Sequence, residues 1–170
     1  MGPLQAEEMF ACLDRHGVRY VLIGGLAAVL HGSPLATFDA DICPDRSVEN
    51  HRKLAAALEE MDARIRTPDA AQGVPFPREA AFLEGVQLLN LVTRFGDLDL
   101  SFSPSGTDGF GDLVRNASTM TIRGHRVHVA ALEDVIRSKE AAGRPKDQRT
   151  LPVLRQLLAE MHKRRGNPAF

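Results

Sequence analysis

Short apolar runs alternate with amphipathic stretches along this chain, a pattern typical of proteins that mix helices and strands. Residues Val18–Ile23 are almost continuously apolar and predict a strand that is buried on both faces. Apolar residues recur at helical spacing in Leu4–His16 and again after Ser47, which is a good N-cap. We therefore predict two helices there, the second running to about Met61.

The remaining elements follow in short succession, separated by glycine, proline and polar clusters. Further helices are predicted at Leu26–His31, Leu132–Ala142 and Thr150–Lys163, and further strands at Ala36–Cys43, Val86–Thr93, Asp97–Ser103, Thr119–Ile122 and Arg126–Ala130. The last four strands form two hairpins. The segment Thr67–Glu79 contains three prolines and a glycine, which predicts a loop that could act as a mobile flap over a substrate.

Composition narrows the class of protein without pointing to an activity. With 170 residues, of which 44% are hydrophobic and 25% charged, residues 1–170 are predicted to form one globular domain. The net charge of −1 gives no overall attraction to nucleic acid. Cys12 and Cys43 are too few for a disulfide framework, so a reducing, cytoplasmic location is expected. No apolar run reaches membrane-spanning length, so no membrane association is expected.

Two aspartates carry the first candidate chemistry. In a strand, Asp39 and Asp41 project from one face, and Phe38, Ala40 and Ile42 form the opposite face, which is apolar enough to belong to the core. Adjacent carboxylates repel each other unless a cation lies between them, and a divalent metal is the usual solution. The alternative is the solvent-facing side of an antiparallel strand.

A pair of glycines precedes these aspartates and suggests a phosphate site. Gly24 and Gly25 follow the buried strand and would expose backbone N–H groups at the start of a helix, where a phosphate can bind. The hydroxyl of Ser33 would join this cradle, or else only initiate the turn before Pro34. Metal-binding carboxylates beside a phosphate cradle favour phosphoryl or nucleotidyl transfer.

The run from Gly24 to Asp41, with its paired glycines and its Thr-x-Asp-x-Asp motif, resembles the signature of the DNA polymerase β-like nucleotidyltransferase superfamily. The surrounding sequence is similar to the minimal bacterial branch, which includes small antibiotic nucleotidyltransferases, MNT domains and AbiEii-type toxins. A second similar stretch is Val129–Asp147. One departure is Leu35, where the branch often has arginine.

This resemblance implies an α/β (α+β) fold with a small mixed β-sheet and helices mainly on one side. It also implies a third carboxylate on a strand beside the Asp-x-Asp strand. In the sequence GDLDL, Asp97 and Asp99 share a face, and Asp99 is the preferred match. Asp97, directly after Gly96, is predicted to serve the turn. The alternative for Asp99 is an ordinary solvent-facing residue.

Lys139 is a less obvious candidate. It continues the apolar stripe of Leu132, Val135 and Ile136, so it would face inward. Its ammonium would need an anion, which a triphosphate could supply, or it would snorkel along the edge of the core to water. The spacing leaves both interpretations of Lys139 open, and the resemblance favours nucleotide binding. Asp147 is predicted to be a helix cap.

Together the residues and the resemblance imply a Mg²⁺- or Mn²⁺-dependent nucleotidyltransferase that moves a nucleoside monophosphate from an NTP to an acceptor hydroxyl or phosphate. Asp39 and Asp41 would hold two metal ions, and Asp99 would bind the catalytic ion and help to deprotonate the acceptor. The paired glycines and Lys139 would hold the β- and γ-phosphates. The acceptor could be a small molecule, a tRNA end or a protein.

Two other functions stay open. The first is a non-catalytic MNT-like subunit or toxin–antitoxin component that acts by pairing with another protein or with a second copy; Leu35 favours it mildly. The second is a nuclease or another metal-dependent phosphodiesterase that uses the same carboxylates.

Overall fold

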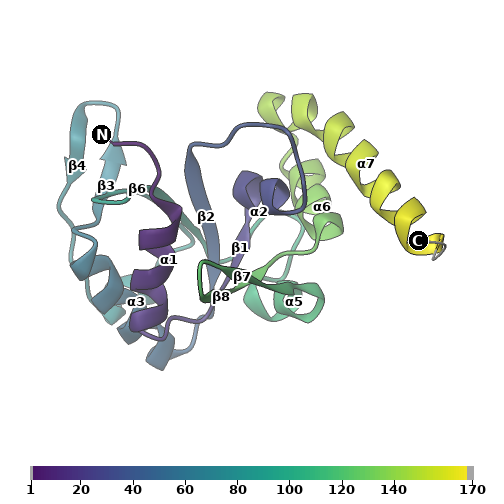
Figure 1. Ribbon diagram of the computed structural model, residues 1–170. Helices are drawn as coiled ribbons and strands as arrows, with labels where there is room; N and C mark the ends of the chain where they lie inside the picture. Colours follow the sequence, from purple (N-terminus) through teal and green to yellow (C-terminus); the bar gives the residue numbers. More distant parts are fainter. Residues whose placement is uncertain (1, 168–170) are drawn as a thin grey trace.

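The structure is a computed structural model that describes residues 2–167 (Figure 1). The helices over these residues are α1 (Ala6–Arg15), α2 (Gly24–Leu30), α3 (Val48–Glu60), α4 (Ala80–Glu84), α5 (Phe110–Asn116), α6 (Leu132–Ala142) and α7 (Pro145–Gly166). The strands are β1 (Tyr20–Ile23), β2 (Asp39–Pro44), β3 (Arg64–Thr67), β4 (Ala70–Val74), β5 (Leu88–Thr93), β6 (Gly96–Ser101), β7 (Ser118–Ile122) and β8 (His125–Val129).

All eight of these strands form one mixed sheet in the order β4-β3-β5-β6-β2-β1-β8-β7. Strand β2 lies at the centre, antiparallel to β1 and parallel to β6, and β1 also pairs in parallel with β8. This arrangement confirms the mixed α/β architecture implied by the resemblance. It also places the strand with the two aspartates directly beside the strand with Asp97 and Asp99.

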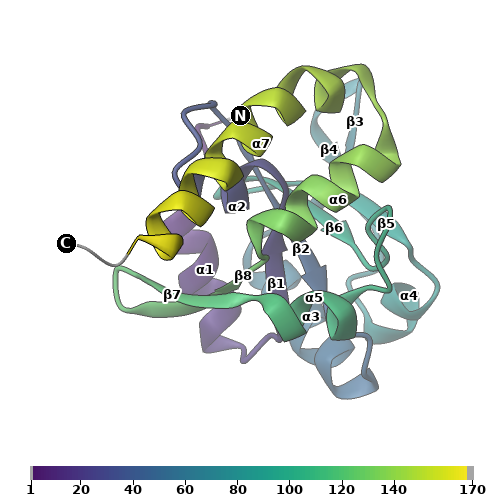
Figure 2. The ribbon, with the colours of Figure 1, turned by 90° about the vertical axis from the view of Figure 1, so that its right-hand side faces the viewer.

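The sequence alternation in β2 and β6 decides which face of the sheet is core. Ala40, Ile42, Leu98 and Leu100 are fully buried, whereas the aspartates between them are only partly buried. In Figure 1, α1 and α3 lie together on the left, α2 lies near the middle beside β2, and α6 and α7 lie on the right. Figure 2 shows α6 and α7 in front of α2 and the central strands. The face of the sheet with Ala40, Ile42, Leu98 and Leu100 therefore belongs to the core, and the opposite face, with the aspartates, can line a site.

The loop prediction for Thr67–Glu79 is wrong for its first half, which contains a strand, whereas residues 75–79 belong to no helix or strand. Strands β3 and β4 form an antiparallel hairpin there, and β3 also pairs with β5 at one side of the sheet. Gly73 has φ +72°, and a Cβ at this position would lie 2.6 Å from Cγ2 of Val92. The glycine that suggested a loop instead lets β4 pack closely against the sheet.

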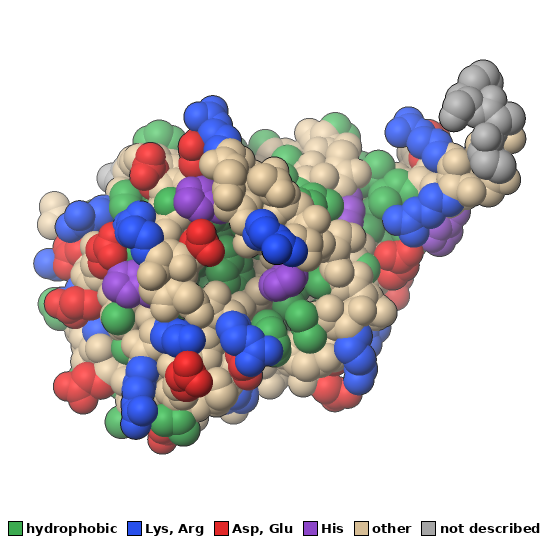
Figure 3. All heavy atoms as spheres, turned by 60° about the horizontal axis from the view of Figure 1, so that its bottom comes forward, with side chains coloured by type: hydrophobic (Ala, Val, Ile, Leu, Met, Phe, Trp, Pro, Cys, Tyr) green, Lys and Arg blue, Asp and Glu red, His purple; other side chains and the backbone are tan. Residues whose placement is uncertain are grey.

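The start of the last helix also differs from the prediction. Helix α7 begins at Pro145 instead of Thr150, because Pro145 suits the first helical position. Pro152 lies inside this helix. The C-terminal end of α7 projects from the body and carries exposed Lys163, Arg164 and Arg165 (Figure 3). Within residues 2–167, no helix combines the length and apolar character needed to span a membrane.

Candidate active site

Three carboxylates from two neighbouring strands converge on one face of the sheet. The register pairs Asp39 with Asp97 and Asp41 with Asp99 across β2 and β6. One oxygen from each of Asp39, Asp41 and Asp99 lies within 4.8 Å of the other two. The structure thus brings together the three aspartates that were expected to bind metal. Oxygen donors this close fit a hard divalent cation such as Mg²⁺ or Mn²⁺.

Burial acts against the charged form of two of these carboxylates, Asp41 and Asp99. Burial, together with the charges of Asp39 and Asp99, raises the pKa of Asp41 to about 7. Burial also raises the pKa of Asp99, although the neighbouring Arg66 acts in the opposite direction. A divalent cation would relieve both the burial cost and the mutual repulsion, so the cluster fits such an ion.

The paired glycines are shaped by their contact with the aspartate strand. Helix α2 begins at Gly24, two residues earlier than predicted, and no described side chain caps its first turn. Gly24 has φ +68°, and a Cβ there would lie 2.5 Å from Oδ2 of Asp41. A Cβ on Gly25 would lie 3.0 Å from Oγ1 of Thr37. Glycine is therefore needed here so that the α2 corner and the carboxylate can approach each other.

Two hydroxyl residues flank this corner. Oγ of Ser33 accepts a hydrogen bond from the backbone N–H of Leu35 at 3.2 Å, so it serves the turn around Pro34, and Ser33 also lines the site cavity. The hydroxyl of Thr37 donates at 3.3 Å to Oδ1 of Asp39. The Thr-x-Asp pair of the motif is thus a local contact that orients the first aspartate.

These groups line a cavity of about 840 Å³ that reaches from the aspartates to α6 and α7. Lys139 lies at this cavity, and its ammonium is 3.3 Å from Oδ1 of Asp147. The anion that faces Lys139 in the structure is therefore a protein carboxylate, an arrangement that was not predicted from the sequence.

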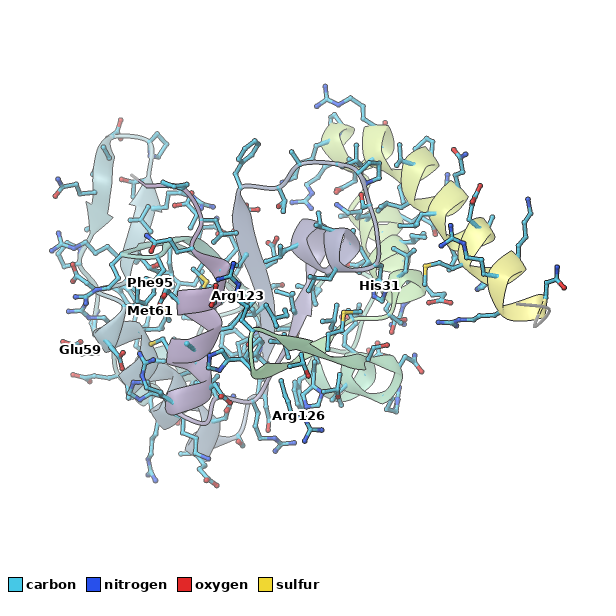
Figure 4. All side chains as sticks on the ribbon, viewed as in Figure 1. His31, Glu59, Met61, Phe95, Arg123 and Arg126 are labelled. Carbon is cyan, nitrogen blue, oxygen red and sulfur yellow. The ribbon has the colours of Figure 1, made fainter. Side chains whose placement is uncertain are left out.

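His31, labelled in Figure 4 near α6, fixes the end of α2 through Nε2, which lies 2.8 Å from the carbonyl oxygen of Ala130.

The prediction that Asp147 caps a helix is wrong. Arg144 occupies the N-cap position of α7, and Asp147 lies within the first turn, fully buried. Its carboxylate accepts hydrogen bonds from Nε of Arg144 at 2.7 Å and from Lys139. Burial acts to raise the pKa of Asp147, but these two cations outweigh it and hold the pKa below the ordinary value. Asp147 therefore orients two cations at the edge of the cavity.

Three cations that line the cavity were not predicted from the sequence: Arg66, Arg144 and Lys146. Lys146 forms no ion pair over residues 2–167, and its charge acts to lower the pKa of Asp41. A signal for two of them was present in the stretch GRPK after α6, but only Asp147 was interpreted there. Arg66 was missed because the sequence indicated no strand between Met61 and Thr67, where β3 lies.

Phe38 and Asp97 differ from their expected environment. Phe38, expected in the core, is 83% exposed, since β2 begins only at Asp39 and Phe38 belongs to the preceding loop. Asp97 does not serve the turn: the hydroxyl of Thr93 makes those contacts, at 2.7 Å to the carbonyl oxygen of Gly96 and 3.0 Å to the N–H of Phe95. The Asp97 carboxylate pairs with Arg66 instead.

A second group with metal-ligand chemistry lies away from this cavity. Cys12, His16 and Glu60 bring donor atoms within 4.8 Å of one another. Glu60 already pairs with both Arg15 and His16, and the thiol of Cys12 donates to the carbonyl oxygen of Ala57. These contacts satisfy the group as an ion-pair network between α1 and α3, with no need for a metal.

No protein-family model matches the sequence, and no curated protein sequence matches it significantly. Several solved structures are similar. A candidate nucleotidyltransferase from Thermotoga maritima is 17% identical over 91% of this chain and 90% of its own, with a TM-score of 0.56. The lincomycin-bound lincosamide antibiotic adenylyltransferase LnuA is 15% identical over 92% and 99%, with a TM-score of 0.58. The antibiotic-resistance factor ANT(2'')-Ia is 15% identical over 94% and 90%, with a TM-score of 0.52. The chain therefore has the nucleotidyltransferase fold, as the resemblance predicted.

Proposed function

We propose that this protein is a metal-dependent nucleotidyltransferase that moves a nucleoside monophosphate from an NTP to an acceptor. The observation that carries the proposal is the convergence of Asp39, Asp41 and Asp99 at one end of a cavity whose other wall carries Lys139 and Lys146. A diester carries a single negative charge at its phosphate, whereas the β- and γ-phosphates of an NTP carry further charge that the cations on this wall would neutralise. The geometry therefore favours transfer from an NTP over hydrolysis of a diester.

The role of each group follows from its position. Asp39, Asp41 and Asp99 would hold the divalent ion or ions, which supply positive charge to the transferring and leaving oxygens. The backbone at Gly24 and Gly25, with the Ser33 hydroxyl, would bind phosphate oxygens at the start of α2. Lys139, Arg144 and Lys146 would bind the pyrophosphate portion, so positive charge would be present although Leu35 replaces the arginine common in the branch.

In the transfer step, an acceptor oxygen forms a bond to the α-phosphorus while the bond to the pyrophosphate oxygen breaks. Asp99 would accept the proton of an acceptor hydroxyl, and pyrophosphate leaves along the wall with the cations. Binding in this orientation turns a reaction between two molecules into an effectively intramolecular one.

Two of the similar structures guide the search for the acceptor, since LnuA is a lincosamide adenylyltransferase bound to lincomycin and ANT(2'')-Ia is an antibiotic-resistance factor. A small molecule with a free hydroxyl is therefore the first acceptor to test, followed by tRNA and protein acceptors. The rival function is a non-catalytic subunit that acts by pairing with another protein, and candidate partners are the products of neighbouring genes.

The test is calorimetric titration of each NTP in Mg²⁺ or Mn²⁺ and again in EDTA, followed by an assay for pyrophosphate release with candidate acceptors. We expect NTP binding only with the metal, because the carboxylates repel a bare triphosphate. Equal affinity in EDTA would contradict the metal-dependent site. Binding without pyrophosphate release from any acceptor would favour a non-catalytic binding subunit instead.

A further inference from the structure

One arginine joins two of the four aspartates on the site face of the sheet. Arg66 lies on β3, which is separated from β6 by β5. Its Nη1 is 2.9 Å from Oδ2 of Asp97, and its Nη2 is 2.8 Å from Oδ1 of Asp99. The guanidinium therefore binds one oxygen of each carboxylate, a fork geometry that fixes both side chains relative to each other.

This contact is partly shielded from water. The side chains of Arg66, Asp97 and Asp99 are 29%, 25% and 15% exposed. Charged hydrogen bonds in such surroundings are stronger than those on an open surface, where ion pairs contribute little. The arrangement therefore restricts the rotamers of Asp99, which is the least exposed of these three side chains.

Asp99 belongs to two groups at once. It pairs with Arg66, and it contributes an oxygen to the cluster with Asp39 and Asp41. The positive charge of Arg66 therefore lies beside a ligand of the expected cation, where it opposes binding of that cation. Arg66 therefore lowers the affinity of the site for a metal ion, and this points to a compensating benefit, namely the orientation of Asp99.

We propose that Arg66 is a positioning residue that clamps Asp99 against Asp97, so that Asp99 holds one orientation toward the metal and the acceptor. Asp97 is the anchor of the clamp and contributes through Arg66 alone. The inference rests on the proposed function, since it assigns Asp99 to that reaction.

The test measures Mn²⁺ affinity by calorimetry without nucleotide, and pyrophosphate release at saturating Mn²⁺. Arg66→Met should bind Mn²⁺ several-fold more tightly, because a positive charge beside Asp99 is gone. The same variant should release pyrophosphate about tenfold to a hundredfold more slowly, because a mobile Asp99 loses its alignment. Misfolding would lower both the Mn²⁺ affinity and the rate of pyrophosphate release. A higher affinity combined with a slower rate therefore identifies a positioning role.

Three further variants sharpen the result. Arg66→Lys keeps the charge but not the fork, so Mn²⁺ affinity should stay near wild type while turnover recovers only in part. Arg64→Met removes an arginine of the same strand that pairs with Asp62 at 3.7 Å, and it should change neither property. Asp97→Asn should slow turnover without tightening Mn²⁺ binding.

Wild-type turnover in Arg66→Met, or weaker Mn²⁺ binding in that variant, would overturn the clamp. If Arg66→Met fails to fold, Arg66→Lys and Asp97→Asn decide the question, and wild-type turnover in both would overturn it. Failure of the proposed function would look different. In that case the wild-type protein would release no pyrophosphate, and the Asp39→Asn variant would bind Mn²⁺ as tightly as the wild type.

Discussion

Gly24 and Asp41 are in contact at the corner between β1 and α2, where a Cβ on residue 24 would lie 2.5 Å from Oδ2 of Asp41. Register pairing brings them together, because Ile23 lies opposite Asp41 across β1 and β2. The start of α2 and the central carboxylate of the cluster are therefore one structural unit, and a change in either should disturb both.

This contact predicts the effect of Gly24→Ala. Alanine at φ +68° is strained by about 1–2 kcal/mol, and its methyl group would displace Asp41. We expect a lower melting temperature and weaker Mn²⁺ binding, measured by calorimetry. The matched control is Gly111→Ala in α5, where a Cβ would meet nothing within 4 Å and where stability should hold or rise slightly. Equal behaviour of the two variants would show that the corner is more tolerant than its geometry indicates.

Asp39→Asn and Asp41→Asn should each abolish nucleotidyl transfer while leaving the fold intact. In the metal-free protein each substitution removes one of several crowded negative charges, so the melting temperature in EDTA should stay level or rise. Asp99→Asn should slow transfer with a smaller effect on NTP affinity. Asp69→Asn, in the turn between β3 and β4, is the control. Any of the three cluster variants that kept wild-type turnover would lose its assignment to the site.

The raised pKa of Asp41 predicts how the stability of the metal-free protein depends on pH. In the folded state this carboxyl keeps its proton up to about pH 7, whereas in the unfolded chain it loses the proton near its ordinary pKa of 3.8. Between these values the folded state binds more protons, so the free energy of unfolding falls as pH rises. Urea unfolding in EDTA across this range should show that decline, and Asp41→Asn should flatten it. A wild-type curve that matches the variant would contradict the raised pKa.

Lys139→Met separates binding of phosphate from support of Asp147. Triphosphate affinity should fall by roughly 1.5–3 kcal/mol for a lost charged hydrogen bond. Adenosine affinity should not change. The melting temperature should also fall, since fully buried Asp147 would keep only Arg144 as a partner. Lys163→Met, at the exposed end of α7, controls for the loss of a positive charge. Unchanged triphosphate affinity would confine Lys139 to a structural role.

Much of the fold was visible in the sequence because its signals are local. The hairpin of β5 and β6 and the helix α6 followed from alternation, turn residues and the apolar stripe, and the structure confirms them. The segment Thr67–Glu79 failed for the opposite reason. Its prolines and Gly73 favour a loop locally, but pairing with β3, which is itself held by β5, gives Ala70–Val74 hydrogen bonds that the segment could not gain alone.

The sequence by itself determined that Asp39 and Asp41 share one face of a strand, because successive side chains of an extended backbone point to opposite sides. Only the tertiary structure decided which other charges meet them. The order of strands placed Asp99 beside Asp41 and let Arg66 reach Asp97 and Asp99, and the packing of α6 and α7 joined Lys139 to Asp147. Such partners depend on which elements become neighbours, and that choice minimises the free energy of the whole chain and not of any one segment.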